Sequence, residues 1–279
     1  MGKVISVINM KGGVGKTTLC IGIADLLSEQ GKSILLIDAD PQFNATQAML
    51  DYYKPNNTDD DDNFYTSEVR PNCRTIYRLF RPQIDMSQSY ETPNEDIIVS
   101  LKPNLDILCG DLNLVLVNQS NDNRFVKRIR NFIEDNNLKE KYDYILIDCP
   151  PTLTIYTDSA LMASDYYLIP NRIDRYSIVG IDSLQKAVSS LIQEERIPLK
   201  CIGLIYTMID SRTSPKQQRI KQNFESKEVV NDLDIFSSVM GTANNIQVGS
   251  SGTIPTKYKK SREDIEAICA ELLQKLDNA

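Results

Sequence analysis

The chain has 279 residues, of which 41% are hydrophobic and 25% are charged, so it is long and apolar enough to bury a core in one large domain. No apolar run approaches the roughly 20 residues that are needed to cross a bilayer, which argues against a membrane-spanning protein and predicts a cytoplasmic one. With a net charge of -7 the chain as a whole repels nucleic acid and acidic lipid, and without histidine it lacks the commonest general base and zinc ligand.

Apolar runs that are typical of buried strands alternate along the chain with amphipathic stretches of helical spacing. This alternation predicts an α/β fold in which a mostly parallel twisted sheet carries helices on both faces. We expect strands at 3–9, 33–38, 105–109, 142–148, 166–170 and 201–209, and helices within 17–30, 44–53, 124–136, 177–193, 214–226 and 261–276. Residues 1–279 are expected to form a single domain.

The segment from about 51 to 103 interrupts this alternation. It is polar, it contains a row of aspartates at 59–62, and its one short helical candidate lies at 75–80. A charge run of this kind is usually a solvated surface excursion, and we adopt that interpretation. A lid over a bound nucleotide or a contact for a specific partner is the alternative.

Six cysteines are scattered along the chain without a C-x-x-C pair. This spacing predicts buried free thiols in a reducing compartment and indicates neither disulfides nor a zinc or iron–sulfur site. Because the chain also has no histidine, chemistry at any active site must rely on carboxylates, lysines, hydroxyls or a bound Mg²⁺.

The sequence KGGVGKTT at 11–18 follows a predicted strand and precedes a predicted helix. Its glycines allow backbone N–H groups to approach phosphate oxygens, while Lys16 suits the β- and γ-phosphates and Thr17 suits Mg²⁺. A chance glycine-rich turn does not explain the order of strand, loop and helix. The sequence therefore predicts a phosphate-binding loop for a nucleoside triphosphate, in a fold of the P-loop NTPase type.

This loop departs from the usual G-x-x-x-x-G-K-[ST] pattern, because Met10 replaces the first glycine and Lys11 follows it. A second lysine at this place marks the deviant pattern K-G-G-x-x-[GS]-K-[ST], and on these residues the chain resembles the ParA/MinD family of ATPases. The resemblance implies that ATP and Mg²⁺ are the cofactors and that Lys11 reaches the partner subunit's nucleotide in a homodimer, like an arginine finger. Considered without its neighbours, Lys11 would be an ordinary solvated lysine. The expected nucleotide-binding residues are Lys11, Gly12, Gly13, Val14, Gly15, Lys16, Thr17 and Thr18.

Acidic residues stand at the ends of two predicted strands. Asp38 and Asp40 follow one of them, and Asp148 ends the other in the Walker B position. Ligands of open α/β sheets lie beyond the carboxyl ends of the strands, so the three acids are expected in one site. Asp38 and Asp148 are expected to hold Mg²⁺ through water, beside Thr17. The D-x-D-P-Q resemblance implies that Asp40 positions or activates the attacking water, with Lys11 and Lys16 as the other catalytic residues. Any one of these acids could instead be a turn or helix-cap aspartate.

The resemblance covers most of the chain outside 51–103, including 103–115, 165–181 and 202–213. Near the C-terminus the sequence MGTANNIQVGSSGT at 240–253 stands where the family often has a stretch with proline and arginine close to the base. The resemblance therefore assigns no adenine contact.

The tail at 261–279 is amphipathic. Its polar side carries five acids and one lysine from Glu263 onward, which anionic lipid would repel. We therefore expect the tail to pack on the sheet rather than to bind a membrane as the C-terminal helix of MinD-type relatives does. Its apolar face consists of Ile265, Ile268, Leu272, Leu273 and Leu276.

ParA-type relatives bind DNA without sequence specificity as ATP-bound dimers, which implies local cations on an acidic chain. The candidate DNA contacts are Arg212, Lys216, Arg219, Lys257, Lys259 and Lys260, and the basic stretch at 124–130 is a weaker candidate. Each group could instead be a solvated helix face.

The resemblance thus implies a ParA-type ATPase for the partition of a plasmid or similar element. ATP would drive dimerisation, the dimer would bind double-stranded DNA on the nucleoid, and a ParB-like centromere-binding partner would stimulate slow hydrolysis. The alternatives are a ParA-like ATPase that positions another cargo, a MinD-like membrane-associated regulator, and a nucleotide-binding module without turnover.

Overall fold

The computed structural model describes residues 1–55, 63–81, 90–117, 123–174, 177–209, 214–242 and 252–279. Within these residues the strands form one sheet in the order β3-β4-β2-β5-β1-β6-β7-β8. Neighbouring strands are parallel except β3, which pairs antiparallel with β4. The predicted mostly parallel α/β fold is therefore confirmed. The strands are β1 (Lys3–Val7), β2 (Ile34–Asp38), β3 (Val99–Lys102), β4 (Leu105–Leu108), β5 (Tyr144–Asp148), β6 (Tyr166–Arg172), β7 (Lys200–Ile209) and β8 (Met240–Gly241).

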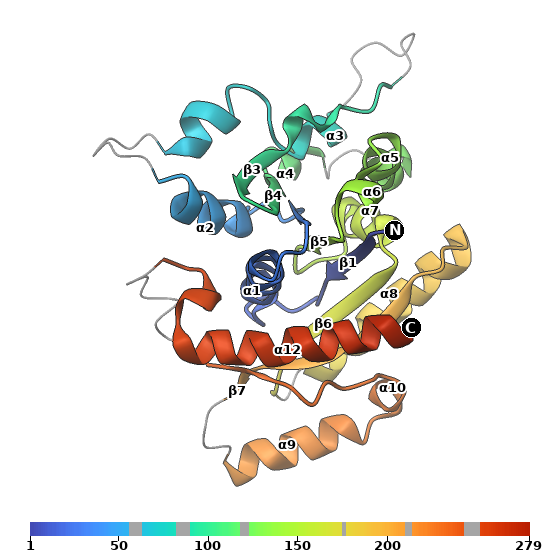
Figure 1. The fold of residues 1–279 in the computed structure, drawn as a ribbon. Helices are drawn as coiled ribbons and strands as arrows, with labels where there is room; N and C mark the ends of the chain where they lie inside the picture. Colours follow the sequence, from blue (N-terminus) through green and yellow to red (C-terminus); the bar gives the residue numbers. More distant parts are fainter. Residues whose placement is uncertain (56–62, 82–89, 118–122, 175–176, 210–213, 243–251) are drawn as a thin grey trace.

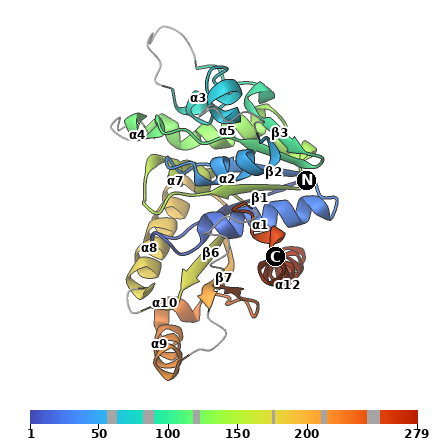
Figure 2. The same ribbon diagram turned by 90° about the vertical axis from the view of Figure 1, so that its left-hand side faces the viewer.

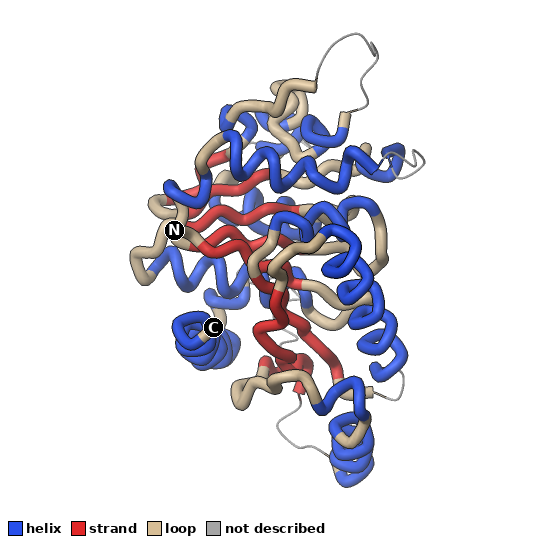
Figure 3. Tube along the Cα trace, turned by 90° about the vertical axis from the view of Figure 1, so that its right-hand side faces the viewer, coloured by secondary structure: helices blue, strands red, loops and turns tan. Residues whose placement is uncertain are grey.

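Helices cover both faces of this sheet, so that the strands lie as a layer between them (Figure 3). One face carries α1 (Lys16–Glu29), α2 (Asn44–Tyr53) and α12 (Lys259–Asn278), whose apolar residues share one hydrophobic cluster. The other face is covered mainly by α5 (Arg128–Asp135), α7 (Ile155–Ala163) and α8 (Ser177–Glu195). The strands read as nearly continuous apolar runs because helices bury both faces. The remaining short helices are α3 (Tyr77–Phe80), α4 (Leu114–Val117), α6 (Leu138–Lys141) and α10 (Glu228–Asn231), together with α9 (Pro215–Glu225) at the β8 end of the sheet.

The expected elements are present within a few residues of their predicted ends. The helix expected at 124–136 consists of a 3₁₀ turn (Asn123–Lys127) followed by α5. The sequence pattern did not predict α7 or the edge strands β3 and β8. These elements are short or mixed in composition, so no clear period marks them.

The solvated interpretation of 51–103 is wrong for the buried apolar residues in the described part of that segment, whereas most of its other described residues are exposed or half-buried. Ile76, Leu79 and Phe80 are fully buried, as are Val69 and Ile97, and β3 extends the sheet. The short helix expected at 75–80 is present as α3. The apolar residues are isolated among polar ones, so their burial follows from long-range packing rather than from a periodic pattern. The aspartates at 59–62 lie outside the described residues.

The predicted packing of the C-terminal tail is confirmed. Ile265, Ile268 and Leu272 of α12 are fully buried, and α12 packs on α1 (Figure 1). A Cβ placed on Gly22 of α1 would lie 2.7 Å from Ile265, so the two helices approach closely because that position has no side chain. The apolar face that a membrane anchor would need is thus used inside the protein. Among the described residues no helix is long and apolar enough to cross a membrane.

Candidate nucleotide-binding site

The glycine-rich loop connects the end of β1 to the start of α1. Gly13 and Gly15 have φ angles of 69° and 81°, which are in the left-handed region that favours glycine. No heavy atom lies within 4 Å of a Cβ built on Gly12 or Gly13, so the backbone there faces open space. The loop is anchored to β7, since the hydroxyl of Thr207 donates a hydrogen bond of 2.7 Å to the carbonyl of Val14. An open backbone on a fixed loop at a helix N-terminus suits phosphate oxygens.

Lys16 and Thr17 open helix α1 at this loop. Lys16 is nearly buried, and its ammonium donates to the carbonyl of Lys11 over 3.3 Å. Burial lowers the pKa of Lys16, although the nearby charges of Asp148 and Asp40 oppose that shift. Thr17 donates its hydroxyl proton to a carboxylate oxygen of Asp148 over 2.7 Å. The loop lysine and the helix threonine therefore face the acid that ends β5.

The two strands that carry the acids are neighbours in the sheet, and Asp38 is the register partner of Asp148. Both side chains are buried. Burial raises the pKa of Asp38 to about 7, and the charge of Asp40 adds to this effect while hydrogen bonds from Thr46 oppose it. Burial and the charge of Asp38 also raise the pKa of Asp148. Two adjacent buried carboxylates are costly unless protons or a cation neutralise them.

The donor set at this edge fits Mg²⁺. Oxygen atoms of Asp38, Asp148 and Thr17 are the hard ligands that this ion prefers, directly or through its water molecules. The Oδ1 atom of Asp148 is buried without a hydrogen-bond partner among the described residues. An acceptor left in that condition is explained by a cation or one of its waters. When bound, Mg²⁺ would supply positive charge to the phosphates of the nucleotide.

Asp40 lies just beyond the end of β2 and is 8% exposed. One of its carboxylate oxygens accepts the backbone N–H of Gln42 over 2.9 Å, and its own backbone N–H points to Asp38. Asp40 therefore stays near the two buried acids at this edge of the sheet.

Lys11 makes an ion pair with Asp174, which lies in the loop between β6 and α8. Its backbone N–H donates to the side-chain oxygen of Asn9 over 2.9 Å, and Asn9 in turn donates to the carbonyl of Pro170. The Lys11 ammonium thus contacts an acid of its own chain. The sequence contained no signal for Asp174, because 163 residues separate the partners.

The predicted DNA-contacting residues separate into exposed and engaged ones. Lys216 and Arg219 on α9 are exposed, as are Lys259 and Lys260 at the start of α12. The first turns of both helices lie on the left-hand side of Figure 1, which faces the viewer in Figure 2. Arg212 lies outside the described residues.

The prediction that Lys257 contacts DNA is corrected by the structure. Its ammonium lies 2.9 Å from Asp25 and 2.8 Å from Glu29, and the side chain is only 17% exposed. An ammonium already held by two carboxylates is a poor phosphate contact, so Lys257 belongs to the packing of α1. Sequence alone showed a basic run at 257–262 and could not show that one member points inward.

Sequence reasoning also missed Thr46, which holds Asp38. Its backbone N–H and its hydroxyl each donate to Asp38 over 2.8 Å. The predicted free thiols are confirmed, since each cysteine is free and most are buried. No group of histidine, cysteine or acidic side chains within the described ranges forms a metal cluster of its own.

Comparison with known proteins identifies the family. A family model described as an AAA domain matches residues 2–201. The chain is 35% identical over 222 residues to the chromosome partitioning protein ParA of Myxococcus xanthus, covering 80% of this chain and 70% of that protein. It is 32% identical to the sporulation initiation inhibitor protein Soj of Bacillus subtilis, covering 80% of this chain and 79% of that protein.

Solved structures share the fold. An ATP complex of McdA from Cyanothece has a TM-score of 0.75 at 20% identity, covering 99% of this chain and 96% of that one. Cobyrinic acid a,c-diamide synthase from Mycobacterium smegmatis, with bound ADP and magnesium, has a TM-score of 0.72 at 20% identity, again covering 99% and 96%. The predicted cofactors ATP and Mg²⁺ agree with these ligands. From its sequence and its fold, the chain belongs to the ParA/Soj family of P-loop ATPases.

Proposed function

We propose that the protein is a DNA-partition ATPase in which ATP binding drives formation of a homodimer. The observation that carries this proposal is the convergence of the deviant phosphate loop with two buried carboxylates on adjacent strands, in a chain related to ParA and Soj. ATP would bind with its phosphates on residues 11–18 and with Mg²⁺ beside Thr17, Asp38 and Asp148. Asp40 would orient the attacking water.

Lys11 is proposed to act on the partner subunit's nucleotide. Charge supplied in this way to a transferring phosphoryl group accelerates other phosphoryl-transfer enzymes by roughly 10³ to 10⁵. The ion pair with Asp174 holds the ammonium within its own chain, so it must open when the second subunit arrives. Hydrolysis by the isolated chain would then be slow.

The dimer is proposed to bind double-stranded DNA without sequence specificity. Exposed Lys216, Arg219, Lys259 and Lys260 support this step, because phosphate contacts need accessible cations. A ParB-like partner would stimulate hydrolysis and end the DNA-bound state. The second candidate is positioning of a different cargo by the same cycle, because a chain with a net charge of -7 repels DNA as a whole.

Binding to nonspecific duplex DNA tests the proposal. Wild type and Lys11→Ala are compared with ATP, with ADP and without nucleotide, at 50 and 200 mM salt, while light scattering follows the oligomeric state. We expect only wild type with ATP to dimerise and to bind, with an affinity that falls steeply as salt rises. Dimerisation without DNA binding would favour the cargo function, and failure of ATP to dimerise the wild type would remove the dimer switch. Sedimentation of the ATP form with anionic vesicles would reveal the membrane alternative.

A further inference from the structure

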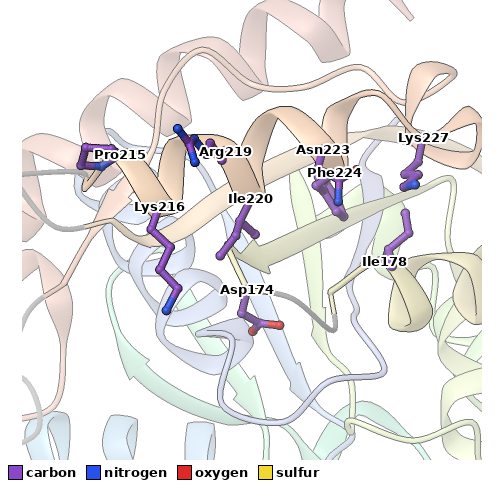
Figure 4. Close-up of a pocket in the computed structure, with 9 residues that line it drawn as sticks. All are labelled: Asp174, Ile178, Pro215, Lys216, Arg219, Ile220, Asn223, Phe224 and Lys227. Carbon is purple, nitrogen blue, oxygen red and sulfur yellow. The ribbon is translucent and has the colours of Figure 1, made fainter.

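A solvent-open pocket of about 760 Å³ lies between the start of α8 and one stripe of α9, and Asp174, the partner of Lys11, lines it (Figure 4). Lys216 and Ile220 extend from α9 toward the loop that carries Asp174, and Ile178 of α8 lies at the other end (Figure 4). Ile220 and Ile178 are only partly covered, and Phe224 is buried behind them. The pocket therefore has an apolar wall that nothing in the described chain occupies.

The rim of this pocket is basic. Lys216, Arg219 and Lys227 line it and are exposed, whereas Asp174 is the one acid among its described lining residues and is paired with Lys11. The chain as a whole has a net charge of -7, so this local excess of cations is the opposite of the general surface charge. Charge complementarity predicts that the pocket receives carboxylates or another anion.

A second depression of about 610 Å³ continues the pocket along α8 toward α10, because both are lined by Ile178 and Lys227. Val179, which is 65% exposed, adds to its apolar floor together with Val229. The acids that line it are Asp182, Glu228 and Asp232. The two depressions thus form one groove, the α8–α9 groove. Apolar side chains line it along its length, with basic side chains at the α9 end and acidic side chains at the α10 end.

We propose that the α8–α9 groove docks an amphipathic segment of a partner protein. The segment would place apolar side chains along Ile178, Val179 and Ile220, acids at the α9 end and basic residues at the α10 end. Lys216 and Arg219 are also proposed DNA contacts, so DNA and the segment would compete for the α9 rim. Inside the groove a DNA backbone fits less well, because phosphates gain nothing from the apolar wall and are repelled by Asp182, Glu228 and Asp232. The groove borders the nucleotide site at Asp174, the partner of Lys11, but segment docking does not depend on the proposed partition activity.

The test uses fluorescein-labelled 18-residue peptides and fluorescence anisotropy at 150 mM salt. Two test peptides carry leucines at helical spacing, with glutamates in one half and lysines in the other, in both orders. A matched peptide has every leucine replaced by serine. The protein variant is Val179→Asp, which introduces a charge on an exposed side chain and should leave the fold intact. The control variant is Leu116→Asp, the same kind of change at a side chain that is 62% exposed on α4, outside the groove.

We expect at least one leucine peptide to bind wild type and Leu116→Asp with equal affinity. Its affinity for Val179→Asp should be at least tenfold weaker, and so should the affinity of the serine peptide for wild type. Failure of both leucine peptides to bind would overturn the proposal, as would equal binding of the serine peptide or undiminished binding to Val179→Asp. Duplex DNA of 20 base pairs is titrated against the same variants in parallel. A tenfold loss of DNA affinity in Val179→Asp would instead assign the groove to nucleic acid. Melting curves of both variants confirm that they are folded.

Discussion

Asp25 connects helix α1, which follows the phosphate loop, to three distant parts of the chain. Its buried carboxylate should make the free energy of unfolding depend on pH. Its fully buried carboxylate accepts hydrogen bonds from Tyr53, Lys102 and Thr256 and pairs with Lys257. Burial by itself would raise the pKa of Asp25, but the hydrogen bonds from these groups outweigh it and lower the pKa to about 2. The charged form is therefore favoured in the folded state.

The magnitude follows from this shift. The ordinary pKa of an aspartate is 3.8 and that of Asp25 is about 2, so the charged carboxylate contributes about 2 kcal/mol to the free energy of unfolding at neutral pH. A lowered folded-state pKa means that this contribution is present above pH 4 and is lost as the pH falls through about 2. Asp25→Asn should cost more, roughly 3 kcal/mol at pH 7, because Lys102 and Lys257 then keep only Glu29 as an acidic partner.

Urea unfolding of wild type and Asp25→Asn, measured between pH 7 and the lowest pH at which unfolding stays reversible, checks this reasoning. The stability difference between the two proteins should narrow by about 2 kcal/mol as the pH approaches 2. Asp182→Asn is the matched control, since Asp182 forms an exposed ion pair with Lys186 and its loss should cost less than about 1 kcal/mol. The buried-charge explanation would be refuted if the free energies of unfolding of wild type and Asp25→Asn differed by under 1 kcal/mol at pH 7. It would also be refuted if that difference did not change with pH.

Further predictions concern the nucleotide site. Asp40→Ala should have an affinity for ATP within about twofold of wild type, yet it should hydrolyse ATP at least 100-fold more slowly, because it lacks the proposed water-orienting group. A phosphate-release assay that shows wild-type turnover for this variant would exclude that role. Asp148→Asn should raise the Mg²⁺ concentration needed for half-maximal turnover roughly tenfold or more, and chelation with EDTA should abolish turnover in the wild type; an unchanged Mg²⁺ titration would count against the metal assignment. Asp174→Asn should strengthen ATP-dependent dimerisation by up to about fivefold, because a partly exposed ion pair no longer restrains Lys11. Analytical ultracentrifugation measures this affinity, and an unchanged or weaker dimer would mean that the ion pair does not oppose assembly.

The phosphate loop and the acids at the strand ends could be predicted from sequence because local order decides them. A buried strand, a glycine-rich turn and a helix must follow one another along the chain for the loop to form, and β1, residues 8–15 and α1 do so. Asp38 and Asp148 end apolar runs, and parallel strands place their ends at one edge. The sheet and its main helices were likewise visible as periods of apolar residues.

Tertiary structure decided what depends on contacts between distant residues. The burial of Ile76 and Phe80, the ion pair of Lys11 with Asp174 and the inward turn of Lys257 each join segments that no local pattern links. The α8–α9 groove is of the same kind, since α9 shows an ordinary basic surface in sequence and gains an apolar wall only beside α8. Chain order determines which groups stand at a strand or helix end, whereas packing alone determines which charges meet, because the energy of a side chain depends on its neighbours in space.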